Sequence, residues 1–213
     1  MPVALILATG NPGKAREFRR LLGAAFDVRP LPASVVLPEE TGETFEANAR
    51  LKAEAVFEAL GGQMAVLADD SGLEVRALGG RPGVMSARYA GEGARDEDNV
   101  RKLLAEVPAA GDRGARFVCR LCLALPAGGR VHEGPTESGR RLVEVEGVSP
   151  GSITHAPRGA DGFGYDPVFQ PEGWEKTLAE AAPADKDRVS HRGAAARALV
   201  RRLTEEGLVR HGS

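Results

Sequence analysis

The fold is decided by the stretch VALILATGNPGKAREFRRLL, residues 3–22. It starts with an apolar run, which is typical of a buried strand, and over residues 15–22 its apolar side chains recur at helical spacing. Between these two parts lies a turn of Thr, Gly, Asn, Pro and Gly. The stretch therefore predicts a strand over 3–8 and a helix over 14–22.

The turn TGNPGK, residues 9–14, has the composition of a phosphate-binding loop but not the pattern of a Walker A loop. A Walker A loop reads G-x-x-x-x-G-K-S/T, in which glycine backbone cradles the phosphates and the hydroxyl helps to hold Mg²⁺. Here Ala8 replaces the first glycine and Ala15 replaces the hydroxyl. A strand, turn and helix still direct free backbone N–H groups and a positive helix end at one place, where Lys14 adds a charge. We predict an anion site, and the alternative is an ordinary connection with a solvated lysine.

The charge balance excludes a general polyanion binder such as a DNA-coating protein. The 213 residues include 28 Lys and Arg against 30 Asp and Glu, a formal net charge of −2. No apolar run approaches the ~20 residues that span a bilayer, and no basic segment followed by an apolar core opens the chain. We expect a cytoplasmic protein without nucleic-acid or membrane partners. Because glycine and proline are dispersed, we expect a single domain over 1–213.

The two cysteines, Cys119 and Cys122, form a C-x-x-C pattern within ARFVCRLCLALP. Such a pattern is found in redox sites and in halves of zinc sites, but the chain has no second pair to complete one. The surrounding apolar residues alternate as in a strand, with the two cysteines on opposite faces. We predict that both are packing residues.

The rest of the chain mixes helical and strand patterns without strict alternation, which predicts an α/β fold with a mixed sheet. The expected elements are an extended piece at 26–30, a loop over 30–42, a helix over 45–60 capped by Thr44, a strand over 64–68, a helix over 96–107, strands over 115–125 and 140–147 separated by a turn at 126–139, and a helix over 193–206.

Two groups of carboxylates are candidate metal ligands. In ADDSGLEV, Asp69 and Asp70 follow a buried strand, point to opposite faces and precede a predicted turn at DSG. Carboxylates at such a tip suit Mg²⁺, whereas in the alternative Asp70 caps a turn and Asp69 is solvated. Glu39 and Glu40 precede the helix at 45–60, where they are either further ligands or charges favoured by the helix dipole.

Two further segments carry groups that could recognise a nucleotide. In GADGFGYDPVF, residues 159–169, an aromatic face can stack on a base and Asp166 can accept hydrogen bonds from ring N–H groups. In the alternative the aromatic residues pack in the core. In DKDRVSHRGAAARA a cluster of polar and cationic residues precedes the last helix, a good place for an anion or a purine edge. The alternative is a set of solvated basic residues and a structural His191.

Four blocks taken together resemble the inosine triphosphate pyrophosphatase family over nearly the whole chain. They are TGNPGK (9–14), EETGETFEANA (39–49), ADDSGLEVRALGGRPGVMSARYAG (68–91) and GFGYDPVF…K…SHRG (162–193). The resemblance implies an elongated central mixed β-sheet flanked by helices, two lobes with an active-site cleft between them, and a homodimer. It also implies Mg²⁺-dependent hydrolysis of ITP, dITP and XTP between the α and β phosphates, which gives NMP and pyrophosphate and keeps deaminated purines out of DNA and RNA.

The resemblance also assigns roles to residues. It makes Asp70 the proton acceptor and places the metal on Asp70 with Glu39 or Glu40, the choice between the glutamates staying open. Asp70 either binds Mg²⁺ or takes the proton, because metal coordination lowers the basicity of a carboxylate. Substrate contacts are assigned to Thr9, Gly10, Asn11, Pro12, Gly13, Lys14, Ser71, Phe163, Gly164, Tyr165, Asp166, Lys186, His191 and Arg192. Asp166 and Arg192 would complement the 6-oxo group and N1–H of hypoxanthine and xanthine, which adenine lacks.

One segment departs from the family pattern, and two other functions compete with the one implied. RRLVEVEGVSP, residues 140–150, is longer than the usual connection and suggests an extended hairpin near the cleft or the dimer edge. A Maf-type pyrophosphatase, acting on pyrimidine or guanine nucleotides, would also combine a phosphate loop with carboxylates, but the SHRG and FGYDP blocks argue against this function. A non-catalytic nucleotide sensor would have no need of Lys14, Asp70 and Lys186.

Overall fold

A computed structural model describes residues 3–23, 26–126 and 140–209. Its helices are α1 (Pro12–Leu22), α2 (Phe45–Ala59), α3 (Asp96–Glu106), α4 (Pro183–Val189) and α5 (His191–Glu205). Its strands are β1 (Val3–Leu7), β2 (Phe26–Pro30), β3 (Ala65–Val75), β4 (Gly114–Pro126), β5 (Arg140–Ile153) and β6 (Phe169–Pro171).

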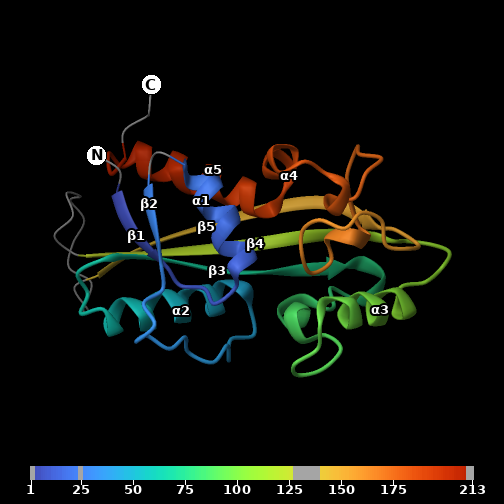
Figure 1. The fold of residues 1–213 in the computed structure, drawn as a ribbon, viewed down its shortest axis with the longest axis horizontal. Helices are drawn as coiled ribbons and strands as arrows, with labels where there is room; N and C mark the ends of the chain where they lie inside the picture. The colour runs from blue at the N-terminus through green and yellow to red at the C-terminus, as the bar shows by residue number, and fades with distance from the viewer. Residues whose placement is uncertain (1–2, 24–25, 127–139, 210–213) are drawn as a thin grey trace. The chain divides into compact units, whose positions relative to one another are not determined.

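The described strands form one six-stranded sheet in the order β2-β1-β3-β4-β5-β6 (Figure 1). Strand β1 runs parallel to β2 and to β3, with Leu5 opposite Val28 on one side and Ala65 on the other. Strands β5 and β6 are antiparallel, with Ser152 opposite Gln170. The sheet is therefore mixed, and the predicted α/β class is confirmed.

The opening strand and helix form where the sequence predicted them, although α1 starts earlier. Leu5 and Leu7 of β1 are buried, as expected for a strand that pairs on both sides. Asn11 caps α1 by accepting hydrogen bonds from the backbone N–H groups of Gly13 and Lys14. Pro12 fits the first helical position because it has no N–H to satisfy there. The helix therefore begins at Pro12 and not at residue 14.

Strand β3 differs from its prediction in an informative way. The prediction ended it at residue 68 and placed a turn at DSG, but the strand continues to Val75. The side chains of Leu73 and Val75 are fully buried. Their burial favours an extended chain through DSG, and it outweighs the turn preference of Asp, Ser and Gly. Asp69 and Asp70 consequently lie inside a buried strand and not at its tip.

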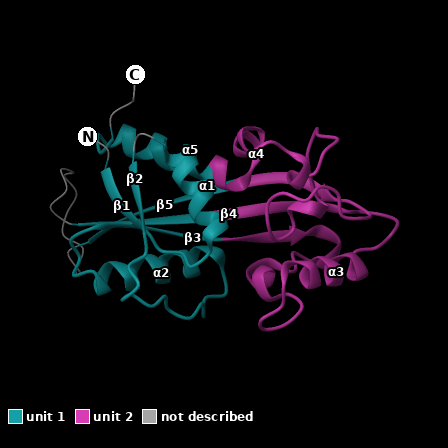
Figure 2. Ribbon diagram, in the orientation of Figure 1, with its two compact units in different colours: residues 1–70, 120–147, 195–213 teal, residues 71–119, 148–194 magenta. Residues whose placement is uncertain are grey.

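The chain divides into two compact units (Figure 2), in agreement with the two lobes implied by the resemblance. Unit 1 comprises residues 1–70, 120–147 and 195–213, and unit 2 comprises residues 71–119 and 148–194. Each unit has its own apolar cluster. In unit 1, α2 packs Ala53, Val56 and Phe57 with strand residues such as Ile6 and Val66.

In unit 2, the apolar cluster joins α3 to the sheet. Val100 and Leu103 of α3 pack with Leu73, Phe117 and Phe169. The Phe117 and Phe169 rings are tilted relative to each other, with centroids 4.6 Å apart. The loop that follows β5 is anchored in the same cluster, and this fixes the candidate base-binding segment on a packed support.

The long segment 140–150 belongs entirely to β5, and 140–147 lies in unit 1. The turn predicted at 126–139 lies almost wholly outside the described residues. Arg140 pairs with Glu54 and Glu58 of α2, and Arg50 of α2 pairs with Glu144 of β5. The segment therefore extends a strand that is tied to α2 by ion pairs. In the described part of the chain, no helix is long and apolar enough to cross a membrane.

Both cysteines are buried on β4 outside any disulfide, as predicted for packing residues, and burial raises the pKa of the Cys122 thiol to about 12. Because the thiolate is the reactive form, we expect native protein at pH 8 to react very slowly with a chromogenic disulfide reagent. Unfolding in guanidinium should release two reactive thiols per chain. Rapid titration of either thiol in the native protein would contradict the packing role.

Candidate functional site

The loop between β1 and α1 satisfies several of its own backbone N–H groups. Besides the two bonds to Asn11, the N–H of Asn11 itself donates to Thr9 Oγ1 at 3.1 Å. The expectation that this loop presents free N–H groups is therefore wrong for Asn11, Gly13 and Lys14 in this structure. The physical reason is that short polar side chains within the loop act as acceptors.

Lys14 is held by a buried aspartate and is not solvated. Its Nζ lies 3.1 Å from Oδ2 of Asp69, and the lysine side chain is only 17% exposed. Asp69 is almost fully buried in β3. Asp69 of β3 thus fixes the position of the Lys14 ammonium. The alternative, an ordinary connection with a solvated lysine, is wrong.

Asp70 points to a different set of partners, as expected for adjacent strand residues. Lys52 Nζ of α2 lies 3.4 Å from Asp70 Oδ1 and 2.5 Å from Glu40 Oε1. Glu40 is partly buried beside this lysine, whereas Glu39 is exposed. The structure therefore groups Glu40, and not Glu39, with Asp70. We call Lys14, Glu40, Lys52, Asp69 and Asp70 the carboxylate cluster; all five belong to unit 1.

Sequence reasoning missed Lys52 and Asn48, although a signal was present. Both are polar residues within the apolar stripe of the helix predicted over 45–60, four residues apart and hence on the same face. Lys is almost never fully buried unless it is paired. A lysine in a core-facing position therefore predicts a buried acidic partner, and the two aspartates of β3 were the obvious candidates.

The carboxylate cluster carries three acidic groups and two lysines, and burial and these charges together shift the pKa values of Asp70 and Lys52. Burial raises the pKa of Asp70 above 3.8, and attraction to Lys52 offsets only part of that effect. Burial opposes the charge on Lys52, but attraction to Asp69, Asp70 and Glu40 prevails and raises its pKa from 10.5. An additional positive charge would therefore be stabilised here.

The donor set fits one kind of metal. Among the described residues, no group of three or more His, Cys, Asp and Glu side chains could hold a metal ion. Mg²⁺ is typically held by only one or two carboxylates, together with waters and substrate phosphates. Glu40 and Asp70, which converge on Lys52, supply two such carboxylates. The residues present therefore fit Mg²⁺ that is shared with a phosphate ligand.

A second group of predicted residues gathers in unit 2 around Asp166. Its Oδ2 accepts hydrogen bonds from Lys186 Nζ at 2.6 Å and from the backbone N–H of Phe163 at 3.0 Å. Gly162 has φ +84°, and a Cβ there would lie 2.2 Å from Asp166 Oδ2. Glycine is thus required for the loop to fold over the carboxylate.

Two cations lie near the ring of Phe163. Lys186 Nζ is 5.1 Å and Arg192 Cζ is 5.0 Å from the ring centroid. A guanidinium N–H of Arg192 also donates to Ser71 Oγ at 2.7 Å. The predicted aromatic and basic residues therefore come together, and their partly buried ring offers a stacking surface.

Two of the predicted substrate contacts, Tyr165 and His191, have buried rings that pack inside unit 2. Tyr165 packs in the core of unit 2, its hydroxyl donates to Ser86 O, and burial raises its pKa. His191, the first residue of α5, stacks on Phe117 with ring centroids 4.6 Å apart and an interplanar angle of 12°. These two rings brace the base of the loop, and Gly164 N bonds to Asp96 of α3.

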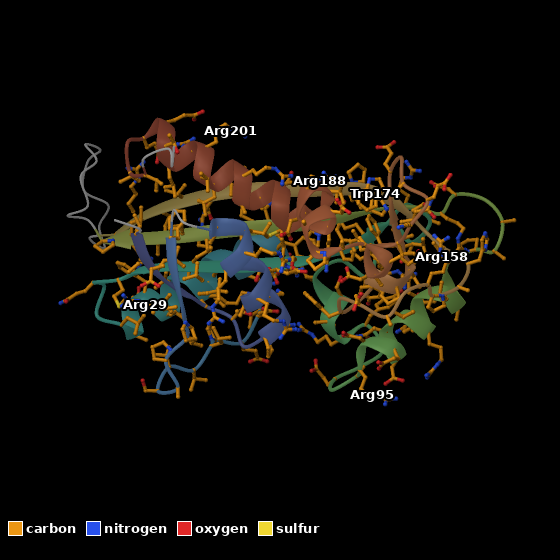
Figure 3. The ribbon with its side chains drawn as sticks, turned by 45° about the horizontal axis from the view of Figure 1, so that its top comes forward. Arg29, Arg95, Arg158, Trp174, Arg188 and Arg201 are labelled. Atoms are coloured by element: carbon orange, nitrogen blue, oxygen red, sulfur yellow. The ribbon has the colours of Figure 1, made fainter. Side chains whose placement is uncertain are left out.

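The surface ion pairs contrast with the buried ones. Arg29, Arg95 and Arg188, labelled in Figure 3, each pair with an aspartate two or three residues away, and their side chains are 53%, 74% and 73% exposed. Such exposed pairs contribute little to stability. The Lys186–Asp166 pair is nearly fully buried, with exposures of 8% and 5%. Breaking a buried pair by removing one partner is strongly destabilising.

Comparison with known proteins agrees with the four motifs. The model of the Ham1 family matches residues 5–202. The chain is 49% identical over 197 residues to a dITP/XTP pyrophosphatase of Gloeobacter violaceus, covering 92% of both chains. It is 44% identical over 204 residues to a dITP/XTP pyrophosphatase of Bacillus subtilis, covering 93% of this chain and 96% of that one.

Solved structures agree as well. The Ham1 protein of Staphylococcus aureus has a TM-score of 0.78 and 38% identity, over 95% of this chain and 99% of that one. A HAM1 protein of Coxiella burnetii has a TM-score of 0.79 at the same identity and coverage. The family expected from the motifs is thereby confirmed, and the chain belongs to the Ham1 family.

Proposed function

We propose that this protein hydrolyses non-canonical purine nucleoside triphosphates, namely ITP, dITP and XTP, between the α and β phosphates. The products are NMP and pyrophosphate, and the proposed role is to remove deaminated purines from the nucleotide pool. The observation that supports it most is the buried carboxylate cluster beside the loop that carries Lys14. The relatives named dITP/XTP pyrophosphatase support the substrate class.

Phosphoryl chemistry asks a protein mainly for positioning and charge neutralisation. Lys14 is the cation of the loop, and its pairing with Asp69 restricts where its ammonium can lie. We propose that the triphosphate takes over Lys14 as partner when it binds. The loop residues Thr9, Gly10, Asn11, Pro12 and Gly13 surround this lysine in sequence and are the proposed phosphate contacts.

Glu40 and Asp70 would hold Mg²⁺, which when bound supplies positive charge to the phosphates. We prefer Glu40 to Glu39 because only Glu40 shares a partner with Asp70, through Lys52. The loop has no hydroxyl residue at position 15 to serve a metal, so carboxylates outside the loop take that task.

The alternative role of Asp70 is to accept the proton released by the attacking water, and Glu40 then holds the metal, because a carboxylate bound to Mg²⁺ is a weaker base. Its carboxylate is buried, and one oxygen faces the amide of Asn48 while the other faces Lys52. Because burial raises the pKa of Asp70, the carboxylate binds a proton more readily than an exposed aspartate does. Lys52 holds the acidic groups together before the substrate arrives.

Base selection is assigned to the group around Phe163. The ring would stack on the purine, and Arg192 would donate to the 6-oxo group of hypoxanthine or xanthine. Adenine places an amino donor at that position, which leaves donors facing each other. A buried mismatch of this kind lowers kcat/KM for the wrong base by orders of magnitude. This group is supported by the side chains of Lys186, Asp166 and Ser71 and by the backbone of Gly164 and Tyr165. The ring of His191 packs beneath it.

A panel of nucleoside triphosphates with MgCl₂ tests the proposal. We expect ITP, dITP and XTP to be hydrolysed far faster than ATP, with pyrophosphate as the inorganic product. Release of orthophosphate without pyrophosphate would contradict the cleaved bond, and equal rates on ITP, GTP and ATP would contradict the specificity. Preference for a pyrimidine triphosphate would favour a Maf-type activity instead. Light scattering of the same sample tests the proposed homodimer, and fractionation of the producing cells tests the proposed cytoplasmic location.

A further inference from the structure

Asn48 is a buried polar residue that the proposed chemistry does not yet use. It lies in the first turn of α2 and is 1% exposed. A buried amide must have its hydrogen bonds satisfied, since leaving one unmade costs about 1–3 kcal/mol. The partners of Asn48 therefore show what its burial achieves.

The Asn48 amide joins two of the groups proposed above. Its Oδ1 accepts from Gly42 N at 2.7 Å, and its Nδ2 donates to Gly42 O at 3.2 Å and to Asp70 Oδ2 at 3.1 Å. The N–H of Gly42 can bond only to the amide oxygen, so Nδ2 must face Asp70. Reversing the amide would set an oxygen against a carboxylate.

Gly42 is the point at which the loop carrying Glu40 meets α2. A Cβ at Gly42 would lie 2.6 Å from Asn48 Oδ1 and 2.9 Å from the Cβ of Ala47. The absence of a side chain there is what allows the loop backbone to approach the amide. Glu40 is two residues away, so fixing Gly42 restricts the position of the Glu40 carboxylate.

The second contact fixes the rotation of Asp70. Asn48 binds Oδ2, and Lys52, one helical turn further along α2, faces Oδ1. The two oxygens therefore have different neighbours, and the carboxylate plane is set by α2. One buried amide thus links the loop of Glu40 to the carboxylate of Asp70 within unit 1.

We propose that Asn48 is a positioning residue, which sets Glu40 and Asp70 in the arrangement that Mg²⁺ binding and proton transfer require. The proposal rests on the proposed function because it takes those two carboxylates as the working groups. Asn48 touches neither substrate nor metal in this proposal and acts through Gly42 and Asp70. Partners of this kind that orient metal ligands typically change metal affinity or activity by about 10- to 100-fold when they are replaced.

The test compares Asn48→Ala with Asn99→Ala. Asn99 of α3 is a matched control, since it is 2% exposed and its amide also bridges one loop, to Ala90 N at 2.7 Å and Ala87 O at 3.2 Å. Among the residues that the structure describes, the Asn99 amide contacts no carboxylate. We expect similar losses of stability in urea unfolding, but only Asn48→Ala should lower kcat for ITP by about 10- to 100-fold with KM little changed.

Direct metal binding provides a readout that does not need turnover. Mn²⁺ titrated into each protein and followed by electron paramagnetic resonance should bind Asn48→Ala about 10-fold or more weakly than wild type. Asn99→Ala should bind Mn²⁺ as wild type does. Gly42→Ala, which disturbs the same link from the loop side, should resemble Asn48→Ala in both measurements.

The outcomes separate this proposal from the function on which it rests. If wild type cleaves ITP but Asn48→Ala matches Asn99→Ala in kcat and in Mn²⁺ affinity, the positioning role is overturned and Asn48 is only structural. If wild type binds Mn²⁺ yet releases pyrophosphate from no nucleotide, the proposed reaction fails, while the Mn²⁺ comparison still decides whether Asn48 positions the carboxylates. If wild type neither turns over nor binds Mn²⁺, both proposals fall.

Discussion

Asp70→Asn is expected to lower the turnover of ITP by about 10²- to 10⁴-fold, the range typical for loss of a general base. The amide keeps the size of the side chain but cannot take a proton. Nucleotide binding should persist, because the phosphate loop and the Phe163 group are unchanged. Steady-state kinetics and equilibrium binding of a non-hydrolysable ITP analogue measure the two effects separately.

The same variant is not expected to lose stability at neutral pH. Burial raises the pKa of Asp70 above its unfolded value of 3.8, so the folded state binds a proton more tightly than the unfolded state does. Asp70 therefore costs stability progressively as the pH rises from about 4 through the raised pKa. Asn carries no charge at any of these pH values, and thermal unfolding of the variant should show a weaker fall in stability over that window.

Two comparisons sharpen this test. Asp27→Asn removes an exposed carboxylate paired with Arg29 and should leave turnover unchanged. Mn²⁺ titration of Asp70→Asn separates its two proposed roles, because retained Mn²⁺ affinity indicates a base and lost affinity indicates a ligand. Turnover like that of wild type would remove Asp70 from the mechanism.

Lys52→Met is expected to have the largest effect on stability. It leaves Glu40, Asp69 and Asp70 without the buried cation that attracts them, and removing one partner of a buried ion pair typically costs about 3–5 kcal/mol. For a chain of this length such a loss lowers the melting temperature by about 6–20 °C. Because the pKa of Lys52 is raised from 10.5, its contribution is fully present at neutral pH and is lost only above about pH 10.5.

A divalent cation should partly reverse the effect of Lys52→Met. If Glu40 and Asp70 hold Mg²⁺, saturating MgCl₂ should raise the melting temperature of the variant more than that of wild type, since the metal replaces missing positive charge. Lys102→Met is the control, because Lys102 is 42% exposed and bonds mainly to a backbone carbonyl. An unchanged melting temperature in Lys52→Met would show that this lysine does not stabilise the cluster.

Local pattern was sufficient wherever a single segment determines its own structure. The apolar run of β1 and the helical spacing that follows it made the first strand and helix predictable, and Thr44 marked the start of α2. The cap at Asn11, which starts α1 at Pro12, was not predicted. The continuation of β3 through DSG was not predictable in the same way. It depends on the burial of Leu73 and Val75 against residues distant in sequence, which no local turn preference records.

The candidate site shows the same division. The motifs predicted roles for Asp70, Phe163, Lys186 and Arg192 but did not indicate which aromatic ring of the GFGYD segment is left partly exposed. The structure buries Tyr165 in the core and leaves Phe163 partly exposed, near the cations of Lys186 and Arg192. The preference for Glu40 over Glu39 also required the structure, because it depends on the position of Lys52, which lies on a different element.

The hydrogen bonds within the loop of Thr9 and Asn11 have a consequence for how a nucleotide is received. Since the loop side chains already serve its backbone N–H groups, the segment does not depend on a ligand to adopt its shape. If this loop contacts the triphosphate as proposed, binding exchanges one acceptor for another and does not require the segment to fold. The conformational entropy of this segment is lost when the protein folds. Ordering the segment therefore does not reduce its affinity for phosphate at each turnover.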